Sequence, residues 1–404
     1  MYNKRPVADN IFYIGVNDRQ KNFFENYLPL PEGISYNSYL IIDEKVALID
    51  AVDIGFADVY FAKIDAILND RPVDYLIINH MEPDHAGAIG LLKQKYPAIQ
   101  MVGNTRTFDM LNGYFGIRTH LHEVKEGSSL SLGKRTLTFY AAPMVHWPEV
   151  MATFESTDHI LFSADAFGSF GTLDGDYLDT RISVERYRNE LRRYYACIVG
   201  KFGAPTQALL KKLSSLEIQT ICPTHGPAWR QEIKNVIRLY DQWSRYEAEE
   251  EGVVIAFGSM YGNTQQLAEA IAEGIVSRGI KNVVIYNVSK TDTSLILSDI
   301  FKYKGLIIGS PTYMNDIYPM IEKLLSAIKH RGIKNRLYSC FGSFTWAGAA
   351  VKQLTAFAAT MGWELAGTPV ENKQAVFPDK YQEAFDLGQT FANRLISLRF
   401  SISR

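Results

Sequence analysis

The chain has few cysteines and no long apolar run. Its 404 residues include only three cysteines, Cys197, Cys222 and Cys340, which are widely spaced and form no CxxC pair. This spacing argues against a disulfide framework and against a thiolate-bound zinc or iron module. The N-terminal residues lack the apolar segment of a signal peptide, and charges interrupt the longer apolar runs within about 18 residues. We therefore expect a cytoplasmic protein without a membrane-spanning helix.

The sequence also lacks an excess of charge of either sign. Its 42 lysines and arginines and 44 aspartates and glutamates give a formal net charge of −2. Proteins that bind nucleic acids or anionic membranes usually carry a basic surface, so we expect neither partner here. The chain is 47% hydrophobic and 21% charged, as ordinary globular proteins are, and its length favours two or three domains.

The pattern of apolar residues changes near residue 250, and we predict two domains, 1–250 and 251–404. In the first, short β-type segments alternate with turns and a few helical stretches, which favours an α+β or layered β-sandwich fold. Examples are the segments 38–50, 74–80, 131–143 and 150–165, and a helix within 185–202.

In the second domain, strongly apolar strands alternate with amphipathic helices. Strands are predicted at 253–259, 283–288, 305–310 and 337–343, and a helix at 265–279 with Gly279 as its cap. Strands this apolar are buried on both faces, as in a doubly wound parallel sheet.

Three polar loops follow strands of this second domain, where a doubly wound sheet binds its ligands. The first reads GSMYGNT, Gly258–Thr264, and the next helix directs its free N–H groups at it, which predicts a phosphate site. The loop has no lysine and is not a GxxxxGK[ST] motif, so a nucleoside triphosphate is not expected. The others are Gly309–Asp316 and Phe341–Gly348, and in the last Trp346 offers a flat surface to an aromatic ring.

These loops resemble those of flavodoxin, and the resemblance spans essentially all of residues 253–404. It implies a bound FMN. The alternative is a set of plain turns, which three such loops in the right order disfavour. The expected FMN contacts are Ser259, Met260, Tyr261, Gly262, Asn263, Thr264, Pro311, Thr312, Tyr313, Asn315, Gly342, Ser343, Phe344, Thr345, Trp346 and Gly348.

Metal-type side chains gather in the first domain in NHMEPDHAG, Asn79–Gly87, directly after an apolar run. This motif resembles the HxHxDH loop of the metallo-β-lactamase fold, an αββα sandwich that holds two zinc ions for hydrolysis. Here Glu82 replaces a histidine. The rest of that ligand set has counterparts at the ends of further apolar runs. The full candidate set is His80, Glu82, Asp84, His85, His146, Asp165 and His225.

The composition of this set bears on which metal it binds. Four imidazoles and three carboxylates without a thiolate suit iron or manganese as well as zinc. A carboxylate such as Asp165 can bridge two metals roughly 3.5–4 Å apart. Glu82 adds negative charge, which stabilises the higher oxidation states of a redox metal and is of no such use to zinc. We therefore favour iron.

A flavodoxin-like domain joined to such a metal domain resembles the flavodiiron proteins over the whole chain. The resemblance implies one iron bound by His80, Glu82 and His146, a second bound by Asp84, His85 and His225, and Asp165 as the bridge. In some relatives the histidine at the position of His85 turns away and water replaces it. Tyr194 and Tyr195 are candidates to lie near the irons, and of the two we select Tyr195. The alternative is that they are aromatic residues of the hydrophobic core.

The resemblance also implies a function. Two ferrous ions and one reduced FMN supply the four electrons that reduce O2 to water. Coupling of two NO molecules to N2O at the same site is the alternative. Electrons would come from rubredoxin, a reduced deazaflavin or a flavin reductase. The implied assembly is a head-to-tail homodimer, or a dimer of dimers, in which the FMN of one subunit faces the irons of the other.

Two rival readings remain. A zinc-dependent hydrolase with a flavodoxin domain would have the same fold, but Glu82 and the flavin loops count against it. A flavoprotein electron carrier with a structural metal site is the other rival. Structural sites usually have four ligands and are closed, whereas this set offers seven.

Overall fold

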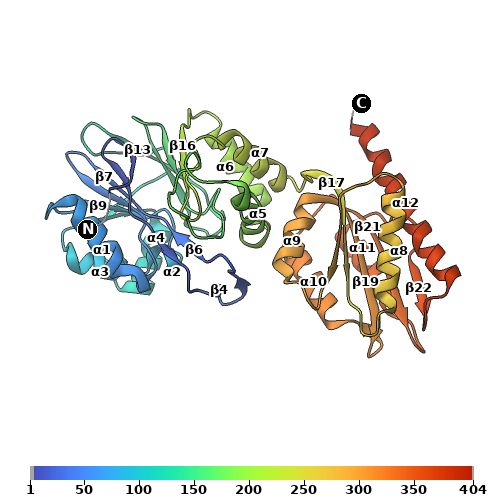
Figure 1. Ribbon diagram of the computed structural model, residues 1–404. Coiled ribbons are helices and arrows are strands. Elements are labelled where there is room, and N and C mark those ends of the chain that lie inside the picture. The colour runs from blue at the N-terminus through green and yellow to red at the C-terminus, as the bar shows by residue number, and fades with distance from the viewer. Residues whose placement is uncertain (1–3, 403–404) are drawn as a thin grey trace. The chain divides into compact units, whose positions relative to one another are not determined.

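The computed structural model describes residues 4–402, with side chains described to residue 398. It forms two compact units, Met1–Asp241 and Gln242–Arg404, shown in Figure 1. The change of sequence pattern near residue 250 falls at the first residue of strand β17 (Glu250–Phe257). Within the described residues, no helix combines the length and the hydropathy needed to span a bilayer.

Two sheets form the core of the N-terminal unit, with strand orders β1-β2-β7-β8-β9-β10-β11 and β12-β13-β14-β15-β16. The strands of the first are β1 (Pro6–Ala8), β2 (Ile11–Tyr13), β7 (Tyr39–Ile42), β8 (Val46–Ile49), β9 (Tyr75–Ile77), β10 (Gln100–Gly103) and β11 (Leu121–Glu123). Those of the second are β12 (Ser129–Ser131), β13 (Thr136–Ala141), β14 (Met151–Glu155), β15 (Ile160–Phe162) and β16 (Thr220–Cys222). Two short ribbons pair β3 (Val16–Asp18) with β6 (Ile34–Tyr36) and β4 (Phe23–Phe24) with β5 (Leu28–Pro29).

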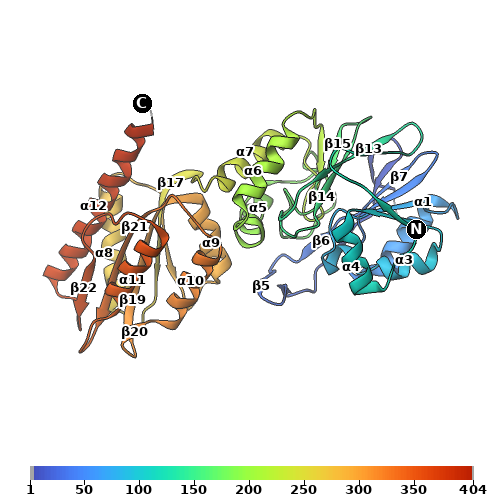
Figure 2. The same cartoon turned by 180° about the vertical axis from the view of Figure 1, so that it is seen from behind.

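Helices flank the two sheets. They are α1 (Ala57–Leu68), α2 (Pro83–Ala86), α3 (Ile89–Lys95), α4 (Thr105–Phe115), α5 (Glu185–Tyr194), α6 (Gly203–Leu213) and α7 (Ile233–Ser244), with a 3-10 turn η1 (Ile54–Phe56) and a π-helical turn η2 (Tyr195–Val199). In Figures 1 and 2, α1 and α3 lie on one side of the sheets and α6 and α7 on the other. The layers confirm the predicted αββα sandwich. Strands such as β8 and β14 are buried throughout, because both of their faces are covered.

Polar residues follow several strands at one edge of this sandwich. β8 pairs with β9 in parallel, and β15 pairs with β16 in parallel, so the carboxyl ends of each pair lie together. A backbone hydrogen bond from Met151 N–H to the Asn79 carbonyl, 3.0 Å long, connects the two sheets at this edge. The loops that follow β9, β13, β15 and β16 therefore converge.

The C-terminal unit is built on a parallel sheet of order β18-β17-β19-β21-β22, with β20 antiparallel to β19. This is the strand order of flavodoxin-like folds, and it confirms the predicted doubly wound sheet. The remaining elements are β18 (Val283–Asn287), β19 (Tyr303–Tyr313), β20 (Asp316–Ile317), β21 (Leu337–Phe344), β22 (Val370–Lys373), α8 (Asn263–Ser277), α9 (Thr293–Lys302), α10 (Pro319–His330), α11 (Ala350–Met361) and α12 (Pro378–Ile402).

Helices α8 and α12 pack closely against each other because each has a glycine at the contact. A Cβ on Gly274 of α8 would lie 2.0 Å from the Phe385 carbonyl oxygen. A Cβ on Gly388 of α12 would lie 2.1 Å from the Ile271 carbonyl oxygen. Beyond the end of α8, Gly279 has a φ of +88°, as expected for the predicted helix cap.

Candidate functional site

The seven predicted metal ligands all lie at the converging edge of the N-terminal unit. They form two adjacent clusters, and in each the ligand atoms lie within 4.8 Å of one another. Every member is buried. The first cluster contains His80, Glu82, His146 and Asp165, and the second contains Asp84, His85 and His225.

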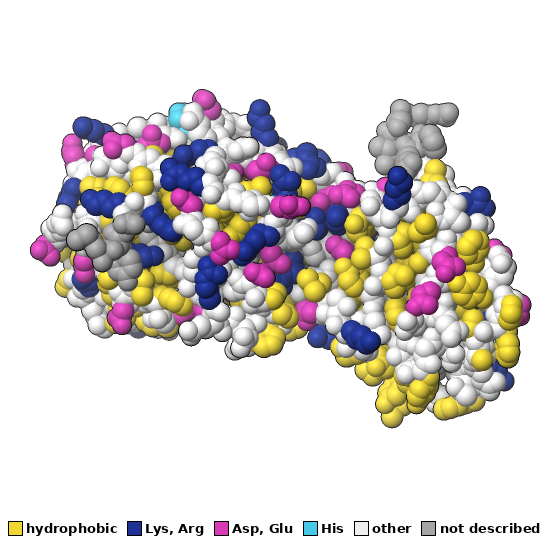
Figure 3. All heavy atoms as spheres, in the orientation of Figure 1, with side chains coloured by type: hydrophobic (Ala, Val, Ile, Leu, Met, Phe, Trp, Pro, Cys, Tyr) yellow, Lys and Arg dark blue, Asp and Glu magenta, His cyan; other side chains and the backbone are white. Residues whose placement is uncertain are grey.

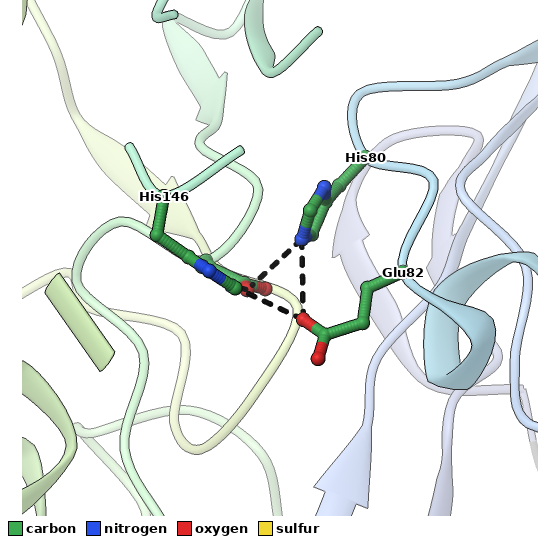
Figure 4. Close-up of side chains that lie close together, drawn as sticks. His80, Glu82 and His146 are labelled. Carbon is green, nitrogen blue, oxygen red and sulfur yellow. Dashed lines mark hydrogen bonds and ion pairs between the residues drawn. The ribbon is translucent and has the colours of Figure 1, made fainter. Parts of the chain in front are cut away.

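The first cluster joins the loop after β9 to the loops after β13 and β15. Glu82 Oε2 lies 3.3 Å from His80 Nε2 and 3.1 Å from His146 Nε2. Asp165 Oδ2 lies 2.8 Å from His146 Nε2. Figure 4 shows His80 and Glu82, from the loop after β9, and His146, from the loop after β13, pointing toward one another. All four side chains direct a nitrogen or oxygen atom at one small volume, as ligands of a single ion do.

The residues of the second cluster come from α2 and from the loop after β16. His225 Nε2 lies 3.3 Å from Asp84 Oδ2 and 3.0 Å from His85 Nε2. His85 therefore points into the cluster in this chain.

Asp165 lies between the two clusters. Its Oδ2 faces His146, whereas its Oδ1 lies 3.1 Å from His85 Nε2. The Thr224 hydroxyl donates a hydrogen bond of 2.5 Å to Oδ1. One carboxylate thus presents each oxygen to a different cluster, which is the geometry of a bridging ligand.

Two further buried carboxylates hold the loop that contains His80. Asp50, directly after β8, accepts hydrogen bonds from the backbone N–H groups of Asn79 and His80, at 2.7 and 3.2 Å. Glu149 accepts one from the N–H of Met81, at 3.0 Å, and one from His80 Nδ1, at 2.8 Å. Three consecutive N–H groups of the loop are thereby fixed to neighbouring strands and loops.

The charges in the clusters depend on each other. Burial opposes charge on His85 and His146, but the neighbouring carboxylates outweigh it and raise the pKa of each to about 9. Burial also opposes charge on Asp165, and there the imidazoles outweigh it and lower its pKa well below the usual range. The negative charge of the carboxylates therefore stabilises positive charge at a buried site. Metal ions and protons compete there for the same nitrogen and oxygen atoms.

Unpaired polar atoms support a metal site here. Among the described residues, three buried atoms of the second cluster have no hydrogen-bond partner: both carboxylate oxygens of Asp84 and the Nδ1 of His85. A buried carboxylate whose neighbouring imidazole nitrogens lie 3.3 and 3.5 Å away is poorly compensated, and an adjacent cation removes this penalty. The donor set and its burial thus fit two metal ions.

Aromatic side chains enclose the second cluster. The rings of Phe24, in β4, and Tyr194, in α5, lie 5.7 and 5.5 Å from the ring of His225. Glu25 follows Phe24, and burial together with the negative charge of Glu82 raises its pKa. Tyr195, the residue selected from the sequence, instead packs on Tyr240, with ring centroids 5.0 Å apart.

The predicted flavin loops meet at the carboxyl ends of the strands of the C-terminal unit. Gly262, before α8, has a φ of +95°, and a Cβ there would meet no atom within 4 Å. The first turn of α8 has no side-chain cap, so its N–H groups are available to a phosphate. A common hollow is lined by Ser259, Met260, Tyr261, Asn263, Thr264, Pro311, Thr312, Ser343, Phe344 and Thr345, all of them predicted contacts.

Several predicted flavin contacts also have roles within the unit. The Thr312 hydroxyl accepts hydrogen bonds from the N–H groups of Ala349 and Ala350, at 3.0 and 3.2 Å. Packing favours glycine at 342, because a Cβ there would lie 2.9 Å from Val351 Cγ2 and 3.0 Å from the Ser310 carbonyl oxygen. At 348 a Cβ would meet the end of the flexible Glu371 side chain, with Oε1 at 2.7 Å. The predicted contacts that do not line the hollow are Gly262, Tyr313, Asn315, Gly342, Trp346 and Gly348.

Large apolar side chains are exposed around this hollow. Tyr261, Met314 and Trp346 are 89%, 83% and 82% exposed, and all lie on the flavin loops. Figure 3 shows hydrophobic side chains gathered at the tip of the C-terminal unit where these loops lie. A surface of this kind commonly binds a ligand or a partner.

Two residues that contribute to the site were missed in the sequence. Glu149 lies in the same loop as His146, and Asp50 directly follows a strand, as the predicted ligands do. Both accept hydrogen bonds from the loop that contains His80, although they are far from it in the sequence. The only signal in the sequence was that each is an acidic residue at a strand end or near a predicted ligand. Acidic residues are too common at such positions for this signal to select Asp50 and Glu149.

Known proteins resemble both units. The family model for the ODP family beta lactamase matches residues 34–226, and the flavodoxin model matches residues 255–388. A nitric oxide reductase of Moorella thermoacetica is 32% identical over 401 residues, which cover 97% of this chain and 99% of that protein.

Two solved structures resemble nearly the whole chain. Rubredoxin oxygen:oxidoreductase of Desulfovibrio gigas has a TM-score of 0.93 at 29% identity, covering 98% of this chain and 99% of that one. The flavodiiron protein of Giardia intestinalis has a TM-score of 0.93 at 26% identity, covering 98% of both chains. With both domains and nearly the full length matched, the chain belongs to the flavodiiron family of oxidoreductases.

Proposed function

We propose that the chain reduces O2 to water at a pair of iron ions, using electrons delivered through FMN. The observation that carries this proposal is Asp165, whose two oxygens face two adjacent clusters of ligands. The iron pair would bind and reduce the gas, and FMN would supply two of the four electrons needed. The protein holds the ligands, encloses the site and presents the flavin.

The ligand set supports iron over zinc. Glu82 places a third carboxylate among the donors, in contact with His80 and His146. Negative charge at this position stabilises an oxidised iron, whereas zinc does not change its oxidation state. The hydrolase alternative would use neither Glu82 nor the flavin loops for its chemistry.

Nitric oxide is the second candidate substrate. The relative from Moorella thermoacetica is named a nitric oxide reductase, whereas the structural relative from Desulfovibrio gigas is named an oxygen:oxidoreductase. Two adjacent metal subsites suit either one O2 or two NO molecules. Both reactions consume protons, and Glu25, whose pKa is raised by loss of solvent around its carboxyl group and by the negative charge of Glu82, is a group that can hold one.

The proposal includes two kinds of partner. Electrons would come from an external carrier, such as rubredoxin, a reduced deazaflavin or a flavin reductase. A second copy of the chain would complete a head-to-tail homodimer, or a dimer of dimers, with the FMN of one subunit facing the irons of the other. The exposed Tyr261, Met314 and Trp346 support such an interface, because they form apolar surface around the flavin site.

Metal and flavin analysis tests the proposed cofactors. Protein produced with iron in the medium should contain two irons and one FMN per chain. The flavin can be identified after heat release, and the metals by mass spectrometry. Two zinc ions in place of iron, with hydrolysis of an ester or amide and no gas consumption, would instead support the hydrolase.

Replacing Trp346 with alanine should weaken FMN binding. Stacking of a flat ring on an aromatic side chain is worth about 1–3 kcal/mol, which corresponds to roughly 5- to 150-fold in Kd. Trp346 is 82% exposed, so the substitution should leave the fold intact. Titration of deflavinated protein with FMN, followed by quenching of flavin fluorescence, measures the change.

The matched control is Trp346→Phe, which retains an aromatic ring and should recover most of the affinity. Equal Kd values for wild type and Trp346→Ala would show that Trp346 does not stack on the flavin.

A further inference from the structure

Three of the four histidines in the two clusters, His80, His85 and His225, differ in what accepts a hydrogen bond from Nδ1, the ring nitrogen that faces away from the cluster. His80 Nδ1 lies 2.8 Å from Glu149 Oε1. An ionised carboxylate can only accept, so Nδ1 has a proton, and Nε2, which lies 3.3 Å from Glu82 Oε2 and 3.4 Å from Asp165 Oδ2, is the ring nitrogen that faces the metal subsite. Glu149 is fully buried, as is His80.

The second cluster has no equivalent of this pair. His225 Nδ1 lies 2.7 Å from the Ser35 carbonyl, a neutral acceptor. His85 Nδ1 has no hydrogen-bond partner among the residues that the structure describes. Among the described residues, an anionic acceptor thus bonds to the Nδ1 of His80 but not to the Nδ1 of His85 or His225, whereas Asp165 is shared by both clusters.

We propose that Glu149 is a positioning residue that makes the two metal subsites unequal. It fixes the ring of His80 and adds negative charge to the subsite formed by His80, Glu82 and His146. The inference rests on the proposed function, because it takes the two clusters to be the subsites of a redox-active pair.

The physical consequence follows from the hydrogen bond. An anionic acceptor makes the imidazole a stronger donor to a metal, and outer-shell partners of this kind are worth about 10- to 100-fold in metal affinity. The same negative charge favours the oxidised state of the ion. The ion next to His80 is therefore the more tightly held and the first to be oxidised.

Two substitutions separate the parts played by charge and position. Glu149→Gln keeps an oxygen where Oε1 accepts from His80 and Met81, removes the charge, and places an NH2 group at the position of Oε2. Glu149→Ala removes the acceptor as well. Glu155→Gln is the matched control, because Glu155 is also buried in this part of the chain but bonds to Thr157, Asp158 and Arg135 away from the clusters.

The test uses full-length protein loaded anaerobically with ferrous iron. The amount of iron that the protein retains at increasing chelator concentration gives the affinity of each subsite. A redox titration followed by electron paramagnetic resonance separates the oxidation steps of the two irons. In Glu149→Ala, one of the two irons should be lost at about 10- to 100-fold lower chelator concentration. In Glu149→Gln, both irons should stay, and one of the two steps should move to higher potential.

The inference is overturned if both variants match Glu155→Gln, or if both irons and both steps change equally. If the wild-type chain selects zinc and shows no redox steps, the proposed function fails. The retention experiment can then be repeated with zinc, and loss of one ion in Glu149→Ala would still support the unequal subsites.

Discussion

Replacing Asp165 with alanine should remove both metal ions and reduce turnover by more than about 100-fold, the upper end of the effect of outer-shell partners. The reason is its position, with Oδ1 facing His85 and Oδ2 facing His146. Loss of this carboxylate leaves each cluster one ligand short and leaves the buried imidazoles without their common counter-charge. Metal content by mass spectrometry and gas consumption measure the two effects.

Asp65→Ala is the control, because Asp65 is a surface residue that pairs with Lys95 and lies in helix α1. It should keep both metals and full turnover. FMN content of Asp165→Ala should stay at the wild-type level, since the flavin loops belong to the other unit. Retention of two metals and of turnover in Asp165→Ala would contradict the bridging role.

Two inactive variants should restore turnover when they form a mixed dimer. The first is Asp165→Ala, which lacks the metal pair. The second is Asn263→Glu, in which a carboxylate at the first residue of α8 occupies the phosphate site and repels the phosphate of FMN. A negative charge at a helix N-terminus is favourable to the helix, so this second variant should still fold.

The proposed head-to-tail dimer fixes the yield of this experiment. When the two chains are co-expressed equally, half of the dimers are mixed and each has one intact pair of centres. Turnover should therefore reach about one quarter of the wild-type value. If electrons instead pass from FMN to the metals of the same chain, turnover should not recover, because neither chain of the mixed dimer has both centres. Asn263→Gln, which adds no charge, is the control and should stay active.

The two clusters of candidate metal ligands could be predicted from the sequence because each member lies shortly after an apolar strand or in a single short motif. His80, Glu82, Asp84 and His85 lie within six positions. The edge of a sheet brings such residues together whatever the details of side-chain packing. The flavin loops could be predicted for the same reason, since Ser259, Thr264 and Ser343 lie at or just beyond the carboxyl ends of parallel strands.

The residues around the ligands could not be predicted in this way. Glu149 is 69 positions from His80 in sequence, and only the packing of two sheets makes them neighbours. The choice between Tyr194 and Tyr195 depended on helix phase. Helix α5 ends at Tyr194 and a π-helical turn begins at Tyr195, so the usual helical period does not hold there. In the structure Tyr194 packs on His225 and Tyr195 on Tyr240.

The most direct test of the account is the consumption of O2 and of NO by the anaerobically reduced protein, recorded in parallel with one artificial electron donor. We predict that O2 is removed with four electrons per molecule and without accumulation of peroxide, and that Asp165→Ala abolishes this removal. Faster loss of NO with N2O as the product would make nitric oxide the preferred substrate at the same site. Consumption of neither gas, or release of one peroxide per O2 at a rate that Asp165→Ala does not change, would contradict reduction at the metal pair.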